Sequence, residues 1–104
     1  KLSLSSAAAA IAAVEKIRGQ VSTVSTACAS GLTAIGLGME RIRLGLADTV
    51  IAGASDTGVT RFLLNLFCSA KFVSFETENP ARAVCPFDLE RTRSVLGDAA
   101  CVLV

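Results

Sequence analysis

The feature that most constrains this chain is a short extended stretch that passes directly into a helix. β-Branched and small residues alternate from Val21 to Ser25, a pattern typical of a buried strand. Apolar residues then recur at helical spacing, at Leu32, Ile35, Met39, Ile42 and Leu46. The connection over residues 26–31 reads T-A-C-A-S-G. Cys28 is therefore predicted to lie at a sharp junction between a strand and a helix.

A cysteine at such a junction has a chemical use. The free N–H groups and the positive end of the helix dipole favour a thiolate over a thiol. The small residues on both sides of Cys28 allow a tight turn that leaves the sulfur accessible, as in a nucleophile elbow. The alternative is that Cys28 is a buried small hydrophobic residue, as most free cysteines are.

The remaining pattern predicts a mixed α/β chain. A helix is expected over Ala7 to Arg18, ended by Gly19. An uncharged strand is expected over Thr49 to Ala54, covered on both faces and joined to the first strand in a right-handed βαβ unit. A final strand is expected over Ala99 to Val104.

Three local questions stay open in the sequence. Residues 61–70 are apolar enough for a short helix or a pocket-lining loop. Asp88 and Arg91, three residues apart, could pair or could each bond to backbone groups, and a structural role is favoured for them over a functional one. The interior glycines of the helix after Cys28 each cost about 1 kcal/mol, which predicts compensation through close packing against another backbone.

Composition indicates part of a large core more than a self-sufficient module. The chain is 52% hydrophobic and only 18% charged, which leaves too few charges to cover the surface of a small domain. It also stops within the apolar run Cys101 to Val104. The interpretation is an interior piece of a longer protein, truncated at both ends.

Charge and residue counts argue against several classes of function. The net charge is +1 with no basic run, so no nucleic-acid partner is expected. The longest apolar run is too short to cross a bilayer, so no membrane span is expected. The four cysteines include no C-x-x-C pair and there is no histidine, so no metal site is expected. The thiols are expected to be reduced, because nothing marks the chain as secreted.

Four ordered motifs over residues 16–104 carry a resemblance to a known family. T-A-C-A-S-G followed by A-I-G resembles the active-site segment of the β-ketoacyl-ACP synthases, the condensing enzymes of fatty-acid synthesis. A-D-T-V-I-A-G-A at residues 47–54 and F-C-S-A-K-F-V-S at 67–74 are similar to the next two motifs of that family. P-F-D-L-E-R at 86–91, with V-L-G-D-A-A at 95–100, is similar to the fourth.

The resemblance implies a fold and a reaction. The fold would be part of a thiolase-like layered α-β-α-β-α arrangement, with residues 1–104 as a partial N-terminal-half domain. The reaction would be the decarboxylative Claisen condensation of acyl-ACP with malonyl-ACP in fatty-acid biosynthesis, through an acyl-cysteine intermediate. No cofactor is implied beyond the phosphopantetheine arm of the carrier protein. The family's two histidines and lysine lie beyond the matched stretch. Residues 1–104 alone would therefore be an incomplete enzyme.

The resemblance also assigns residues and partners. Cys28 would be the acyl acceptor, and Ala27, Leu63 and Phe67 would line the acyl pocket, although ordinary core packing is the alternative for these three. Lys71 would contact the acidic acyl carrier protein, although an isolated surface lysine is usually only solvated. The full-length enzyme would be a homodimer in the cytoplasm or in an organellar stroma or matrix.

Two alternatives remain beside this interpretation. One is a thiolase or a polyketide-type condensing enzyme, against which T-A-C-A-S-G and the P-F-D-x-x-R segment favour the fatty-acid branch. The other is a non-catalytic remnant or interaction fragment, which the missing histidines favour. Replaced family glycines also favour the remnant, and they fall at Leu63, Asn65, Leu66, Arg93, Ala99 and Cys101.

Overall fold

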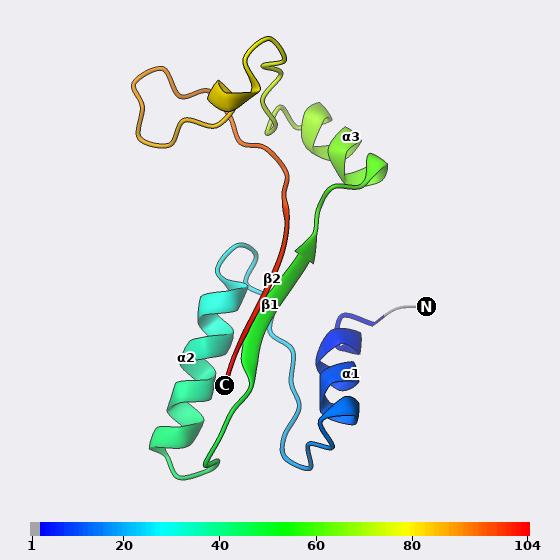
Figure 1. Cartoon of the computed structure of the whole chain (residues 1–104), viewed down its shortest axis with the longest axis vertical. Helices are drawn as coiled ribbons and strands as arrows, with labels where there is room; N and C mark the ends of the chain where they lie inside the picture. Colours follow the sequence, from blue (N-terminus) through cyan, green and yellow to red (C-terminus); the bar gives the residue numbers. More distant parts are fainter. Residues whose placement is uncertain (1–2) are drawn as a thin grey trace. The chain divides into compact units, whose positions relative to one another are not determined.

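The computed structural model describes residues 3–104, which pack as two parts. One part reaches from the N-terminal side to Ala54 and includes Cys101–Val104, and the other is Ser55–Ala100. The elements in chain order are α1 (Ser6–Val14), α2 (Ser30–Arg43), β1 (Ala52–Thr57), α3 (Arg61–Ser69), the 3₁₀ turn η1 (Pro80–Arg82) and β2 (Asp98–Leu103) (Figure 1).

Strands β1 and β2 pair in a two-stranded sheet (Figure 1). Gly53 lies against Cys101 and Val102, whereas Gly58 lies near the Gly97 carbonyl, so the strands run antiparallel. A Cβ added to Gly53 would overlap the Cys101 carbonyl oxygen and would lie 2.9 Å from the Val102 Cα. The close approach of the two strands therefore requires glycine at position 53.

Helix α2 packs against β1 and the residues just before it through two of its glycines. A Cβ added at Gly31 would lie 3.3 Å from the Ala54 Cβ, and one at Gly38 would lie 3.0 Å from a Val50 methyl group. Gly36 faces open space. Close packing is thus present at Gly31 and Gly38 and absent at Gly36, and its nearest atoms belong to side chains and not, as predicted, to another backbone.

The three α-helices end in the same way, with one residue in the left-handed conformation. Lys16, Gly45 and Lys71 have φ angles of 54°, 68° and 57°. The residue after each donates to the carbonyl five positions back, as Ile17 does to Ala12 and Phe72 to Phe67, both at 2.9 Å. This is the Schellman arrangement. The prediction that Gly19 ends the first helix is wrong, because these bonds close α1 at Val14.

The predicted strand over Val21–Ser25 is not formed. None of the hydrogen bonds among residues 3–104 uses the backbone of this stretch. An extended segment becomes a strand only through a partner with which it forms a ladder. The predicted parallel βαβ unit is therefore also not observed, and the two strands present are an antiparallel pair.

The other predicted strands and helices are shifted or more exposed than expected. The strand expected over Thr49–Ala54 is observed as Ala52–Thr57, and its last four residues are exposed on a face predicted to be covered. The final strand is one residue earlier than predicted. Within helix α2, Gly38 is the only buried residue, and Leu32 is 77% exposed.

The part formed by Ser55–Ala100 has a small core of its own. Val73 and Ala83 are its buried apolar side chains. The segment around Val73 pairs in parallel with Ser94, through Ser74 N–H to the Ser94 carbonyl at 2.8 Å. Residues 61–69 form helix α3, which settles the choice between helix and loop, and the Thr60 hydroxyl caps it by accepting from Leu63 N–H at 3.3 Å.

Within residues 3–104, no helix combines the length and the apolar character needed to cross a membrane.

The contrast between Gly36 and Gly38 yields a matched stability test. Gly36→Ala should raise the free energy of unfolding by about 1 kcal/mol, because alanine restricts the unfolded chain and the added methyl group meets nothing. Gly38→Ala should lose this gain and become destabilising by about 1 kcal/mol, because its methyl group presses on Val50. Denaturant unfolding of both variants measures the difference, and equal stabilities would contradict the packing of α2.

Candidate active site

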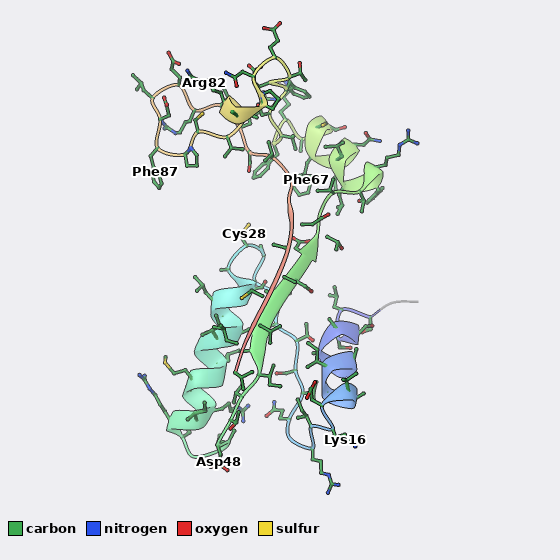
Figure 2. All side chains as sticks on the ribbon, in the orientation of Figure 1. Lys16, Cys28, Asp48, Phe67, Arg82 and Phe87 are labelled. Atoms are coloured by element: carbon green, nitrogen blue, oxygen red, sulfur yellow. The ribbon has the colours of Figure 1, made fainter. Side chains whose placement is uncertain are left out.

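The turn before α2 presents Cys28 to solvent. Figure 2 shows Cys28 on the turn at the N-terminal end of α2, and its side chain is exposed. Ala27 has a φ of 52°, a left-handed conformation that alanine adopts rarely. The left-handed residue directly before the cysteine makes the turn sharp enough to leave the thiol at its surface.

The Ser30 hydroxyl group braces this turn with two hydrogen bonds. Its Oγ accepts from the Thr26 N–H at 2.8 Å and donates to the Ala27 carbonyl oxygen at 2.6 Å. The Ser30 N–H donates to the same Ala27 oxygen at 3.0 Å. One serine thus holds both residues that precede Cys28.

The hydroxyl groups of Thr26 and Thr33 form a second set of bonds, which holds Ala29, the residue after Cys28. Thr33 Oγ1 donates to the Ala29 carbonyl oxygen at 3.0 Å, and it lies 3.0 Å from Thr26 Oγ1. Because the Thr33 proton is used toward Ala29, the Thr26 hydroxyl is the donor in the contact between the two threonines. The sequence analysis did not single out Ser30 or Thr33. The signal was available, since serine near a helix start commonly bonds to nearby backbone groups.

Helix α2 begins two residues after Cys28. Its first helical residue is Ser30, and the preceding Ala29 is the cap and has no capping side chain. Cys28 therefore lies just outside the helix, in the predicted turn but not after a formed strand. Its backbone N–H donates to no acceptor in the part of the chain that the structure describes. The thiol and an unused N–H are thus both available at this turn.

The other predicted site residues lie on and after α3. Leu63 and Phe67 are half-buried and, four residues apart, share one face of the helix. The Phe67 ring lies 5.6 Å from the Phe72 ring. Lys71 is exposed in the turn that ends the helix. Ala27 and Cys28 are thus together in one part of the chain, and Leu63, Phe67 and Lys71 are together in the other.

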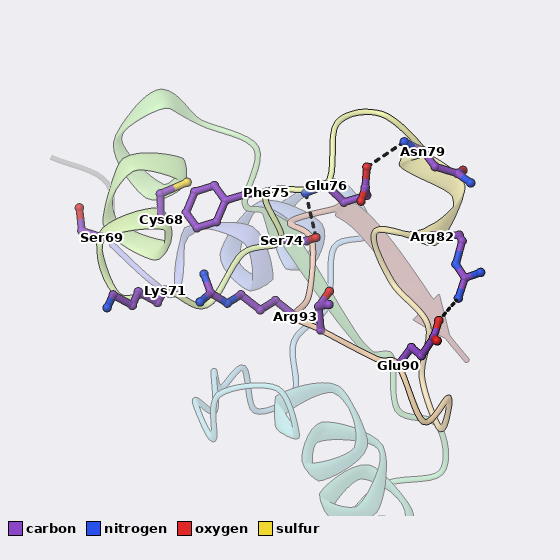
Figure 3. Close-up of a pocket in the computed structure, with 11 residues that line it drawn as sticks. Cys68, Ser69, Lys71, Ser74, Phe75, Glu76, Asn79, Arg82, Glu90 and Arg93 are labelled. Atoms are coloured by element: carbon purple, nitrogen blue, oxygen red, sulfur yellow. Dashed lines mark hydrogen bonds and ion pairs between the residues drawn. The ribbon is translucent and has the colours of Figure 1, made fainter.

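An open recess of about 790 Å³ lies beside Lys71 (Figure 3). Most of the residues that line it carry polar or charged groups, among them the cations of Lys71, Arg82 and Arg93. Arg82 forms an ion pair with Glu90 at 2.9 Å, and the Arg93 guanidinium lies 5.3 Å from the centre of the Phe75 ring. No ion pair among residues 3–104 involves Lys71, so its charge is free to attract an acidic partner.

Glu76 shapes the loop at the edge of this recess. One oxygen of its carboxylate accepts the N–H groups of Asn79 and Glu78, each at 2.8 Å. These bonds hold the pKa of Glu76 below its usual 4.5, and the bond from Asn79 has the larger effect of the two. The nearby Arg82 charge lowers the pKa further. The carboxylate therefore stays ionised and keeps the loop turned.

The sequence left two alternatives open for Asp88 and Arg91, and the structure shows the one in which each bonds to backbone groups. The Asp88 carboxylate accepts from the Glu90 N–H at 2.8 Å, and the Arg91 guanidinium donates to the Asp88 carbonyl at 2.9 Å. The Arg82–Glu90 ion pair was not predicted, and its partners lie eight residues apart across an irregular loop, where no helical or strand spacing signals a contact.

A second hollow of about 360 Å³ lies between α2 and the sheet, beside the first residue of β1 and the last residue of β2. Its lining is almost wholly apolar and includes Ile35, Met39 and Leu103. Neither this hollow nor the recess near Lys71 is lined by Ala27, Leu63 or Phe67. The acyl pocket assigned to those three residues therefore stays a prediction.

All four cysteines, at 28, 68, 85 and 101, are free thiols. Cys85 donates weakly to the Arg82 carbonyl at 3.3 Å. Over residues 3–104, His, Cys, Asp and Glu side chains form no group of three that could hold a metal ion.

Comparison with known proteins gives a consistent family. Residues 1–104 match the model of the β-ketoacyl synthase N-terminal domain. The ketoacyl synthase alpha subunit of the tetracenomycin polyketide synthase from Streptomyces glaucescens is 43% identical over 86 residues, which is 83% of this chain and 20% of that protein. The 3-oxoacyl-[acyl-carrier-protein] synthase 2 of Rhizobium meliloti is 35% identical over 99 residues, which is 94% of this chain and 24% of that protein.

A solved structure agrees with these relatives. It is a type II polyketide synthase acyl-carrier protein in complex with its ketosynthase bound to the hexaketide, with a TM-score of 0.91 and 39% identity. The match covers 96% of this chain and 25% of the solved chain. The chain thus spans about a fifth to a quarter of the length of the proteins it matches. The predicted α/β class, as part of a thiolase-like ketosynthase, is confirmed.

Proposed function

Because the chain belongs to the β-ketoacyl synthase family, as its N-terminal domain, we propose that Cys28 is the acyl acceptor of a carrier-dependent condensing enzyme. The observation that carries this proposal is the exposed thiol on the turn before α2, within the family-matched stretch. A nucleophile for acyl transfer needs this exposure and a nearby donor for the developing oxyanion. The unused Cys28 N–H supplies that donor.

The first half of the reaction needs only Cys28 and a thioester. The Cys28 thiolate attacks the carbonyl carbon of an acyl group held on the phosphopantetheine arm of acyl carrier protein. The new C–S bond forms first, and the collapse of the resulting tetrahedral oxyanion breaks the bond to the pantetheine sulfur, so that the carrier thiolate leaves and takes up a proton. The oxyanion formed in between accepts a hydrogen bond from the Cys28 N–H.

The second half forms a carbon–carbon bond. Malonyl-ACP loses CO₂, and the resulting carbanion attacks the acyl-Cys28 carbonyl, which releases the thiolate and gives a 3-ketoacyl thioester on the carrier. Residues 1–104 contain no histidine. We therefore assign the decarboxylating groups to residues outside this stretch, in keeping with the fraction of its relatives that the chain spans.

The acyl substrate has two candidate classes. The motif T-A-C-A-S-G with P-F-D-L-E-R favours fatty-acid synthesis, and relatives named 3-oxoacyl-[acyl-carrier-protein] synthase 2 support it at 35–36% identity. A polyketide chain is the second candidate, supported by polyketide synthase relatives at 42–43% identity. In either case we propose that Ala27, Leu63 and Phe67 line the acyl pocket and that the bulk of Leu63 narrows it.

The partner in both cases is an acyl carrier protein. The solved ketosynthase at 39% identity is in complex with its acyl-carrier protein, which supports this partner. We propose that the complete enzyme is a homodimer that works in the cytoplasm or in an organellar matrix or stroma. A relative from Schizosaccharomyces pombe named as mitochondrial is in keeping with the organellar choice.

Removing the nucleophile tests the proposal directly. In the protein with its natural flanking sequence, Cys28→Ala should lower the rate of acyl transfer from acyl carrier protein by on the order of 10³ or more. Cys101→Ala is the matched control, because Cys101 is also an exposed free thiol, and it should keep the rate within about twofold. Radiolabelled acyl transfer measures both, and a Cys28→Ala variant that still becomes acylated would disprove the assignment.

Reversing one charge tests the carrier contact. Lys71→Glu should raise KM for acyl carrier protein by about three- to tenfold and leave kcat unchanged, because the exposed unpaired cation attracts an acidic partner. Lys16→Glu is the control, since Lys16 is also exposed and also holds the left-handed position after a helix. Steady-state kinetics at low and moderate salt measure both, and an equal effect of the two variants would rule out a specific role for Lys71.

A further inference from the structure

The carbonyl group of Ala27 is held by two donors from one residue. The Ser30 hydroxyl donates to it at 2.6 Å and the Ser30 N–H at 3.0 Å. The same hydroxyl oxygen accepts from the Thr26 N–H at 2.8 Å, which fixes the hydroxyl in turn. The orientation of the Ala27 carbonyl is therefore set from the start of α2.

The peptide unit that follows transmits this orientation to Cys28. The Ala27–Cys28 bond is trans, since residues 3–104 contain no cis peptide. In a planar trans unit the C=O and N–H groups point in opposite directions. Because Ser30 draws the Ala27 oxygen toward the helix start, the Cys28 N–H is directed away from it. Across the described stretch of residues 3–104, that N–H has no acceptor.

The conformation of Ala27 explains why such a brace is needed. Its φ of 52° lies in the left-handed region, where the Cβ of alanine crowds the following carbonyl. An unrestrained alanine prefers the right-handed region. A move of Ala27 into that region would rotate the Ala27–Cys28 peptide plane and the Cys28 N–H with it. The two Ser30 bonds oppose that rotation.

We propose that Ser30 is a positioning residue that aims the Cys28 N–H at the oxyanion formed during acyl transfer. The inference rests on the proposed role of Cys28 as acyl acceptor and adds the residue that orients its donor. A donor fixed in advance stabilises developing charge without reorganising during the reaction. Ser30 touches neither the acyl group nor the sulfur in this role, and it acts only through the Ala27–Cys28 peptide unit.

Two reactions of the Cys28 sulfur distinguish a lost orientation of the Cys28 N–H from a general loss of thiol reactivity or of folding. Acyl transfer from an acyl-pantetheine thioester develops an oxyanion, whereas alkylation by iodoacetamide does not. In the protein with its natural flanking sequence, Ser30→Ala should slow acylation of Cys28 about tenfold and change its alkylation less than twofold. Ser30→Thr, which keeps the hydroxyl, should keep both rates near those of the natural protein. Peptide mapping reports Cys28 alone.

Ser69→Ala provides the matched control. Ser69 Oγ also donates to a helix-region carbonyl, that of Asn65 at 2.8 Å, and its loss should leave both rates unchanged. An undiminished acylation rate in Ser30→Ala would overturn the inference and leave the proposed function standing. An equal fall in acylation and alkylation would also overturn it, because the effect would then lie on the thiol or the fold. A natural protein that alkylates but never acylates at Cys28 would refute both proposals.

Discussion

The close approach of α2 to β1 and the residues just before it is the contact that orders the site-bearing part of the molecule. It depends on the absence of side chains at Gly31 and Gly38, because a Cβ at either position would press on Ala54 or Val50. Because α2 is fixed there, the turn that precedes it has a defined position. The hydroxyl groups of Ser30 and Thr33 then set the backbone on both sides of Cys28.

The sequence predicts the helix after Cys28 and the turn before it because their signals are local. Helical spacing after Cys28 depends only on neighbours along the chain, and this segment is a helix. The run at residues 61–70 left helix and loop open, and the structure shows the helix. The stretch 21–25 has the composition of a strand but no partner with which to pair among residues 3–104, so no strand forms. The sequence predicts that α1 ends at Gly19, but Lys16 adopts the left-handed conformation and the helix ends earlier.

The reactive cysteine of the candidate site could be predicted from the sequence, but the hydrogen bonds that surround it could not. The motif around Cys28 marked the thiol, but the Ser30 hydroxyl bonds to the left-handed Ala27, whose conformation its residue type does not predict. The replaced family glycines cause no backbone conflict, because none of their positions has a positive φ in the described chain. The residues that lie there are Leu63, Asn65, Leu66, Arg93, Ala99 and Cys101.

The central claim is that the turn at Cys28 is folded as a nucleophile turn, so that one thiol of four is singled out for acylation. Labelling the protein with a thiol-reactive mimic of an acyl substrate, followed by intact-mass analysis and peptide mapping, tests this most directly. The account predicts modification of Cys28 well ahead of Cys68, Cys85 and Cys101, even though Cys101 is also exposed. Equal modification of all four thiols would contradict it.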